Sequence, residues 1–414
     1  MASFNLTNFD AAMKHMYPYK KVENMVYKNN PLLAMVPKET TFPGRNATYA
    51  VEYGMTTGRS ANFQTAQNNR GGTKLEDFVV TRVKDYAVVS VDNETLLAAD
   101  GSEGSLLDVA KAKTDSALHA LARTMGRDIY RSGTGAIGQI HASPSLGNTS
   151  IELVEGHAVN FEVGMRLKAS ATDGSALYGG VLEVTAVDRD NDVLTTSVAG
   201  TTGIPSLTSS DFFYVEGDAA NGGSNIKMSG LDAWLPSSVS SSSFFGVDRT
   251  LDTTRLGGQR QGYANSVQET IINAAVKTAL EGGRPDAVFM NPTDWAELAL
   301  DLEGRAAVAG ANNRRRYDAD DRAASFGFSS ISIATPTGMV DVFADHNCPI
   351  KVAYLLQMDT WKLKSLGSAP RLLDFDGLQG VRQSNEDGVE YRWGYYGNLL
   401  CTAPGYNCRI ALSS

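Results

Sequence analysis

The chain has 414 residues, 42% hydrophobic and 20% charged, which is the composition of a folded protein of two or three domains and excludes overall disorder. Its formal net charge of −9 argues against a protein that wraps duplex DNA tightly, because such proteins need a basic face. No run reaches 18 apolar residues and the N-terminus has no apolar signal-peptide stretch, so we expect neither a membrane span nor secretion.

The N-terminal part of the chain predicts two extended arms. Residues 1–45 carry four prolines between short apolar patches, and we expect them to lie along a neighbouring surface. Residues 46–91 hold two β-rich runs separated by about twenty residues rich in Gly, Asn, Gln and Thr. A structureless loop of that length is unusual in a compact domain, so a long β-hairpin with a polar tip is favoured over a solvated loop. An isolated hairpin is marginal in water and needs a second molecule to lie on. Three basic residues near its tip are candidates for pairing with a neighbour's acidic groups: Arg59, Arg70 and Lys74.

The longest helical pattern in the chain runs from Ser105 to Arg131. Apolar side chains recur at three- and four-residue spacing, and Ser105 with Asp108 resembles a capping box. A helix of that length measures about 40 Å, which suits a beam along which other parts are arranged. Its predicted core-facing side chains are Leu107, Leu118, Leu121 and Met125.

A second β-rich region, residues 146–218, predicts a small barrel or sandwich inserted between glycine-rich segments. The segment Gly133–Gly138 matches G-x-G-x-x-G, but it ends a helix instead of opening one, so we expect a flexible exit and no dinucleotide site. Asp188, Asp190 and Asp192 have the alternation of a calcium loop without its Gly and Glu, which favours a hairpin turn.

Residues 219–370 predict an α/β layer. Ser266 and Glu269 form a capping box before one helix, and Asn291 with Pro292 marks the start of another that runs to about residue 302. Short strands are expected at 287–290, 330–334, 339–344 and 352–357. A triple arginine, Arg314, Arg315 and Arg316, lies beside aspartates, so a solvated or subunit-contact loop is favoured over a phosphate site.

The inventory of catalytic groups is thin. There is no zinc-protease motif, phosphate loop or nucleophile elbow. Cys348 beside His346 invites a thiol or metal site, but nothing places the other cysteines, Cys401 and Cys408, near them, and buried cysteines are the commoner case. We therefore predict no catalytic residue, no cofactor and no metal, and a structural protein.

The order of these parts resembles the tailed-bacteriophage major capsid protein with the Hong Kong 97-type fold, an α+β fold. Local stretches are similar too: residues 230–236 (GLDAWLP), residues 288–292 (VFMNP) before Trp295, and Met358–Trp361 (MDTW). The resemblance implies that residues 46–91 are the extended loop, that 92–145 hold the spine helix of the peripheral domain, and that 219–370 form the axial domain. It further implies C-terminal return strands of the peripheral domain at 371–414, and makes 146–218 an additional inserted β domain.

As a capsid protein the chain is expected to form the hexamers and pentamers of an icosahedral head enclosing double-stranded DNA, assembled in the host cytoplasm and ending in the virion. The resemblance implies a scaffolding protein and a portal as partners, with a decoration protein as a further candidate and no membrane contact. Some relatives crosslink a Lys to an Asn of the next subunit; Lys74 lies in the right arm, but its partner is not identifiable and we predict no bond. The beginning at Met1 favours an uncleaved chain.

Three other classes of protein stay open at this level. A non-viral encapsulin-like nanocompartment shares the fold. An adhesin would fit the β insert but needs a secretion signal, and a cytosolic enzyme would use Cys348 and His346.

Overall fold

The computed structural model describes residues 30–42, 44–92, 105–241, 243–308, 330–373, 381–382 and 387–413, with the side chains of 105–115 and 303–308 left out. The chain divides into two compact units. Within the described residues the first unit holds parts of 85–124 and 368–395, and the second holds parts of 30–84, 125–367 and 396–413. Three elements run through both: β4 (Val83–Asp92), α5 (Ser105–Asp128) and β19 (Gly388–Cys401).

The first unit is built on the N-terminal half of the long strand β19. Antiparallel to it lie β17 (Arg371–Leu372) and β18 (Val381–Arg382), and β4 pairs with it as well. The helix predicted from Ser105 is present as α5, which ends three residues before the predicted Arg131, and its last described side chains in this unit include the buried Leu121. This unit therefore combines one long helix with a small sheet built on β19.

The second unit contains a six-stranded mixed sheet. Its order is β11 (Gln259–Gln261), β20 (Cys408–Ala411), β15 (Val352–Leu356), β12 (Ala287–Met290), β14 (Gly338–Ala344) and β13 (Ser330–Thr335). Helices α8 (Val267–Leu280) and α9 (Pro292–Val308) share its apolar core. Ser266 caps α8 as predicted, its hydroxyl accepting from the Glu269 amide at 3.3 Å.

The position of the C-terminal strand β20 shows that one predicted domain boundary is wrong. Residues 371–414 were predicted to return to the peripheral domain, but β20 lies between β11 and β15 of the second unit's sheet. Cys408 and Ile410, which alternate along β20, are fully buried in the core of that sheet. Their burial on one face fixes the strand there.

The β-rich insert forms a closed six-stranded sheet. Its order is β5 (Ala136–Gln139), β10 (Phe212–Val215), β7 (Arg166–Ser170), β8 (Leu182–Asp188), β9 (Val193–Thr196) and β6 (Ser150–Glu152), with the short α6 (Gly200–Gly203) in a loop. A bridge between Ile140 and Leu153 joins the two end strands, so the sheet is a barrel. The barrel begins ten residues before the predicted 146, because the GTGAIG segment supplies β5.

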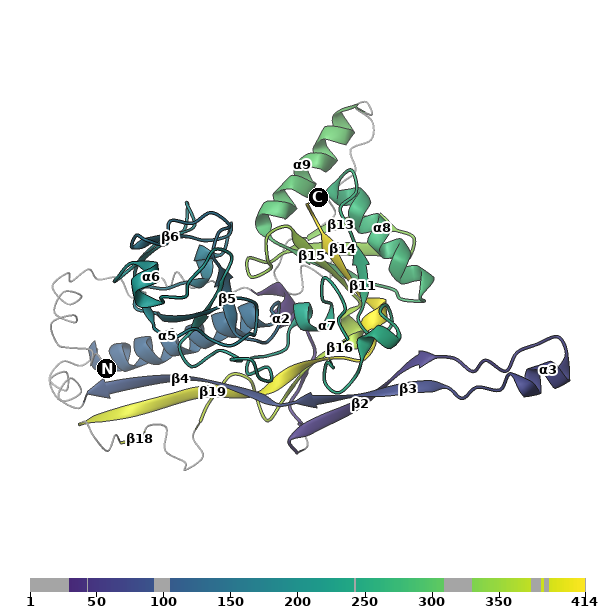
Figure 1. Ribbon diagram of the computed structural model, residues 1–414, viewed down its shortest axis with the longest axis horizontal. Helices are drawn as coiled ribbons and strands as arrows, with labels where there is room; N and C mark the ends of the chain where they lie inside the picture. Colours follow the sequence, from purple (N-terminus) through teal and green to yellow (C-terminus); the bar gives the residue numbers. More distant parts are fainter. Residues whose placement is uncertain are drawn as a thin grey trace. The chain divides into compact units, whose positions relative to one another are not determined.

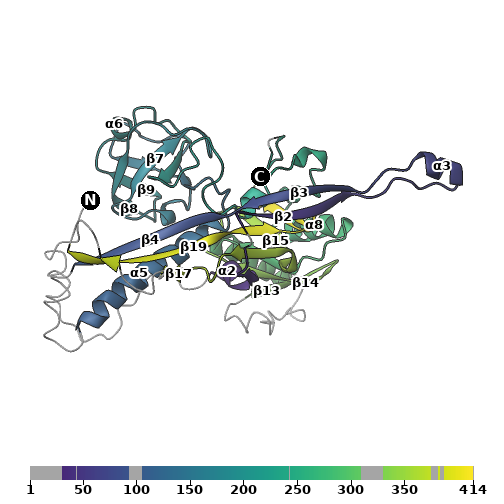
Figure 2. The same ribbon diagram turned by 90° about the horizontal axis from the view of Figure 1, so that it is seen from below.

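The hairpin arm is present. It is shorter at its base than the predicted 46–91, and its tip contains a helix that the sequence did not predict. It consists of β2 (Asn46–Gly54) and β3 (Lys74–Thr81), with helix α3 (Phe63–Asn68) in the tip (Figures 1 and 2). The β-rich run at 78–91 divides at Arg82, and β4 leaves the hairpin to pair with β19. Other elements are α2 (Pro31–Met35), β1 (Lys38–Glu39), α7 (Leu231–Trp234) and β16 (Trp361–Ser365), together with the short 3₁₀ helices η1 (Ala158–Asn160), η2 (Arg249–Leu251), η3 (Met358–Thr360) and η4 (Pro404–Tyr406).

Candidate functional site: the arm and its root

The tip of the arm is closed by its own hydrogen bonds. The Asn62 side chain caps α3, accepting from the amides of Gln64 and Thr65 at 2.9 and 3.3 Å. Thr57 donates its hydroxyl to the Asn69 carbonyl at 3.0 Å, which ties the two sides of the tip together. The tip is therefore a preformed element.

The tip carries an unbalanced positive charge and exposed apolar groups. Between Tyr53 and Leu75 there are three basic residues and no Asp or Glu. Arg59 and Arg70, both predicted to make contacts, are exposed at the tip, and no residue from 55 to 75 is buried. Phe63 is 77% exposed. A large exposed aromatic among unpaired cations is typical of a surface that contacts another molecule.

The root of the arm is fixed by an aromatic cluster. Phe78 of β3 lies 5.3 Å from the Trp234 ring, and Trp234 also packs against Phe244 and Phe245. The Trp234 indole donates to the Leu399 carbonyl at 3.2 Å, and all of its surface is buried. Trp234 belongs to the GLDAWLP stretch that resembles the capsid family. Its packing against Phe78 joins segments that are far apart in the chain, which the local sequence pattern does not indicate.

Arg255 holds the other strand of the arm. Its Nη1 donates to the Tyr53 carbonyl at 2.9 Å, and its Nε pairs with Glu281 at 3.0 Å. The Glu281 carboxylate raises the pKa of Arg255, so the guanidinium stays charged. Sequence reasoning missed this clamp because about 200 residues separate Arg255 from Tyr53, and an isolated arginine in a loop carries no local pattern.

Replacing Arg255 by Ala tests the clamp. We expect faster amide hydrogen exchange in residues 46–54 and a loss of unfolding free energy of about 1 kcal/mol, since the pair is partly solvent-exposed. Hydrogen-exchange mass spectrometry measures the first effect and urea unfolding the second. Arg260→Ala is the matched control: that guanidinium donates to the Gly257 and Thr253 carbonyls instead of the arm. Equal exchange in the arm of both variants would show that Arg255 does not hold it.

A cavity of about 340 Å³ lies beside this clamp. Its walls come from β2 and the following residues, from Arg255 and Glu281, and from the turn at 402–406. Glu52 and Tyr406, both at least partly exposed, line it.

The predicted core side chains of the spine helix differ in how deeply they are buried. Leu121 and Met125 are 2% and 0% exposed, whereas Leu118 is half-buried. The side chain of Leu107 and the whole of Arg314, Arg315 and Arg316 lie outside the described residues.

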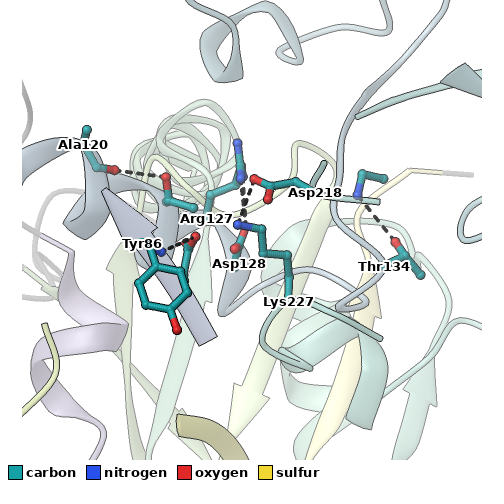
Figure 3. A network of polar contacts seen from close by, with 10 residues as sticks. Tyr86, Ala120, Arg127, Asp128, Thr134, Asp218 and Lys227 are labelled. Carbon is teal, nitrogen blue, oxygen red and sulfur yellow. Dashed lines mark hydrogen bonds and ion pairs between the residues drawn. The ribbon is translucent and has the colours of Figure 1, made fainter. Parts of the chain in front are cut away.

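The segment that leaves the spine helix is ordered by polar contacts, which corrects the predicted flexible exit. The Ala220 amide donates to Thr134 and the Lys227 amide to Gly133, so the two linkers of the barrel run side by side. The buried Lys227 ammonium pairs with Asp218 at 2.8 Å, near the pair of Arg127 with Asp128 (Figure 3). Gly135 has φ +94°, and a Cβ there would meet the Asp218 carbonyl oxygen, so only glycine fits this crossing.

The barrel also contacts the start of α9 through Lys351. The Lys351 ammonium pairs with Glu155 at 3.1 Å, and its amide donates to the buried Asp294 carboxylate at 2.9 Å. Burial raises the pKa of Asp294 to about 6, and the nearby Glu297 and Glu155 add to this effect while Lys351 opposes it.

Asp294→Asn should remove a pH dependence of stability. The pKa of Asp294 is higher in the folded chain than the unfolded value of about 3.9, so its contribution to stability is present at pH 4 and is lost as the pH rises through 6. We expect Asp294→Asn to be more stable than the wild type by about 2 kcal/mol at pH 7 and equal to it near pH 4. Urea unfolding at several pH values measures this difference, and a constant difference would contradict the assignment.

The cysteines and the residues around His346, which were considered as a catalytic or metal site, are buried or make structural contacts. The Tyr130 hydroxyl donates to Asp345 at 2.8 Å, His346 lies 3.9 Å from Asp345, and burial raises the pKa of Cys348 well above its ordinary value. Cys401 and Cys408 are buried, and burial raises the pKa of each to about 12.

The aspartate-rich turn holds backbone amides. Asp188 accepts from the amides of Asp190 and Asn191, and Asp192 accepts from those of Gly156 and Ala158. Within the described residues no group of three acidic, His or Cys side chains could hold a metal ion. No helix in that part of the chain is long and apolar enough to cross a membrane.

Comparison with known proteins relates this chain to capsid proteins. Residues 209–389 match the family model of the SU10 major capsid protein. A search of curated proteins found no match. The cyanophage A-1(L) capsid protein superposes with a TM-score of 0.56 over 99% of both chains at 11% identity. The capsid of a native GTA particle gives 0.46 over 100% of both chains at 9% identity, and SrpI encapsulin from Synechococcus elongatus 0.46 over 100% and 97% at 8%. The likeness to the cyanophage chain confirms the Hong Kong 97-type fold.

Proposed function

We propose that this chain, which is a phage major capsid protein, builds an icosahedral head from hexamers and pentamers by laying its arm on the adjacent subunit. The family match over residues 209–389 and the fold support the capsid function and its place in the virion. The observation that carries the mode of assembly is the arm, whose tip is preformed, exposed and positively charged.

The arm suits overlap between subunits for a physical reason. A two-stranded ribbon gains little stability alone in water, so an arm with no buried residue from 55 to 75 is stabilised when a second molecule covers it. Its root is fixed by Arg255 and by the cluster around Trp234, so little freedom at the base is lost on docking. Because tip and root are different surfaces, the contact is head-to-tail, and such contacts close into rings where the rotation from one subunit to the next divides a full turn.

Other parts take the roles that the capsid fold gives them. We assign residues 219–370 to the axial domain, with Arg314, Arg315 and Arg316 at the contacts around the five- and six-fold axes. Residues 136–215 form an additional domain on the outer surface. The spine helix, β19 and three of its partner strands, β4, β17 and β18, form the peripheral domain.

The partners we propose are other copies of the chain, a scaffolding protein, a portal and, on the outside, a decoration protein. Double-stranded DNA is enclosed without sequence-specific contact. The net charge of −9 favours weak contact between wall and genome, since counterion release needs a basic surface. The three thiols are buried, and the Asp345 carboxylate accepts a hydrogen bond from Tyr130. Both observations support a structural role without catalysis.

Electron microscopy of the expressed chain, alone and with its scaffolding protein, tests this function. We expect capsomer rings or closed shells, with scaffold favouring shells of uniform size. A chain that stays monomeric in both preparations would overturn the proposal. Shells that contain a protein cargo and exclude DNA when made during infection would favour a nanocompartment instead.

A further inference from the structure

We propose that the cavity at the root of the arm is the docking site for Arg59 of a second copy. This inference rests on the proposed function and specifies where the arm tip binds. The guest is the guanidinium of Arg59, and the host is the cavity lined by Glu52 and Tyr406.

The cavity offers a negative charge that the chain itself leaves unpaired. Arg255, the cation in its wall, is already paired with Glu281 and bonded to the Tyr53 carbonyl. Glu52 is exposed and forms no ion pair in the part of the chain that the structure describes, although Lys74 lies nearby opposite Gly54. The free group on the cavity wall is therefore a carboxylate.

The cavity also offers surfaces that suit a planar cation. Tyr406 and Met55 line this cavity, and the two residues are 36% and 76% exposed. A guanidinium stacks on a tyrosine ring and can donate two hydrogen bonds to one carboxylate, whereas an ammonium does neither as well. The volume of about 340 Å³ is near the lower end of small-molecule sites, enough for one large side chain.

Arg59 is the basic residue of the tip that is most available as a guest. Arg70 already donates from Nε to the Gln67 carbonyl at 2.9 Å, and Lys74 begins β3 next to the host cavity. Arg59 is exposed, and no hydrogen bond or ion pair of its side chain is present in the described chain. The closed tip fixes the backbone that carries Arg59, so little backbone freedom is lost on binding.

The two surfaces meet only between copies. The tip, which carries α3, lies at the far end of the arm from α8 (Figures 1 and 2), and Glu281 directly after α8 lines the cavity. Each copy therefore presents one guest and one host at separate places, which is the requirement for a head-to-tail ring.

Charge reversal with rescue tests the contact. Glu52→Arg and Arg59→Glu each change an exposed residue, so each subunit should keep its circular dichroism spectrum and melting temperature. We expect each change alone to lower the assembled fraction at least about tenfold, measured by sedimentation velocity. The double variant should recover to within about threefold of the wild type.

Two controls make the outcome specific. Glu297→Arg changes an exposed acid on α9, and combining it with Arg59→Glu should give no recovery. Mixing the Glu52→Arg and Arg59→Glu chains should restore rings with an even number of subunits, because every contact between unlike chains pairs one arginine with one glutamate, whereas a ring of five must contain a contact between like chains.

Different results would contradict the Arg59 contact and the proposed capsid function on which it rests. If the wild type assembles but the double variant does not recover, or if Glu297→Arg restores assembly to Arg59→Glu, the tip binds elsewhere and this inference is wrong. If the wild type forms no oligomer with or without scaffold, the capsid assembly that it depends on is overturned as well.

Discussion

Leu121→Asp is expected to prevent the subunit from folding and to abolish particle formation. Leu121 lies in α5 and is 2% exposed, so the substitution loses apolar burial and places a carboxylate in an apolar site. We expect a loss of unfolding free energy of at least about 4 kcal/mol, a large part of the 5–15 kcal/mol that stabilises a typical domain. The measurement is the yield of soluble protein and its urea midpoint.

Ser116→Asp is the matched control on the same helix. Ser116 is exposed, and Ser and Asp have similar helix propensities, so this variant should lie within about 0.5 kcal/mol of the wild type. Leu118→Asp should fall between the two, because Leu118 is only half-buried. Intact particles from Leu121→Asp would show that this face of the helix is not packed against the rest of the subunit.

Local patterns were enough to locate the elements whose signals lie within a few residues. Ser105 begins the spine helix and Ser266 caps α8, because a cap and a stripe at three- and four-residue spacing belong to one short segment. The strand at 287–290 is fully buried, as its continuous apolar run predicted.

Other boundaries depend on partners that the local pattern does not contain. The β-rich run at 78–91 divides at Arg82 because β3 pairs with β2 and β4 pairs with β19, more than 300 residues later. The same limit hid the destination of β20 and the clamp formed by Arg255. The sequence showed the charged tip of the candidate site as Arg59, Arg70 and Lys74. It did not show the cavity, because four segments far apart in the chain build it.

Asn407→Ala is expected to cost about 3–5 kcal/mol of unfolding free energy, although it removes only a small amide. The side chain is fully buried. Its oxygen accepts from the Gln357 amide at 2.8 Å and the Trp361 indole at 2.9 Å, and its nitrogen donates to the Thr360 hydroxyl and the Ala403 carbonyl. Removal leaves the two donors without an acceptor, and each buried donor without a partner costs about 1–3 kcal/mol.

A double-mutant cycle with Trp361→Phe separates this cost from simple loss of packing. Phenylalanine has no indole N–H, so in its background Asn407→Ala leaves one donor fewer unsatisfied. We expect Asn407→Ala to cost at least about 1 kcal/mol less in the Trp361→Phe chain than in the wild type, measured by urea unfolding of unassembled subunits. Equal costs in both backgrounds would mean that the indole bond contributes nothing. Asn407 joins the turn before β16 to the turn before β20, so its loss loosens the wall of the cavity at 402–406 and should lower docking of the arm together with stability.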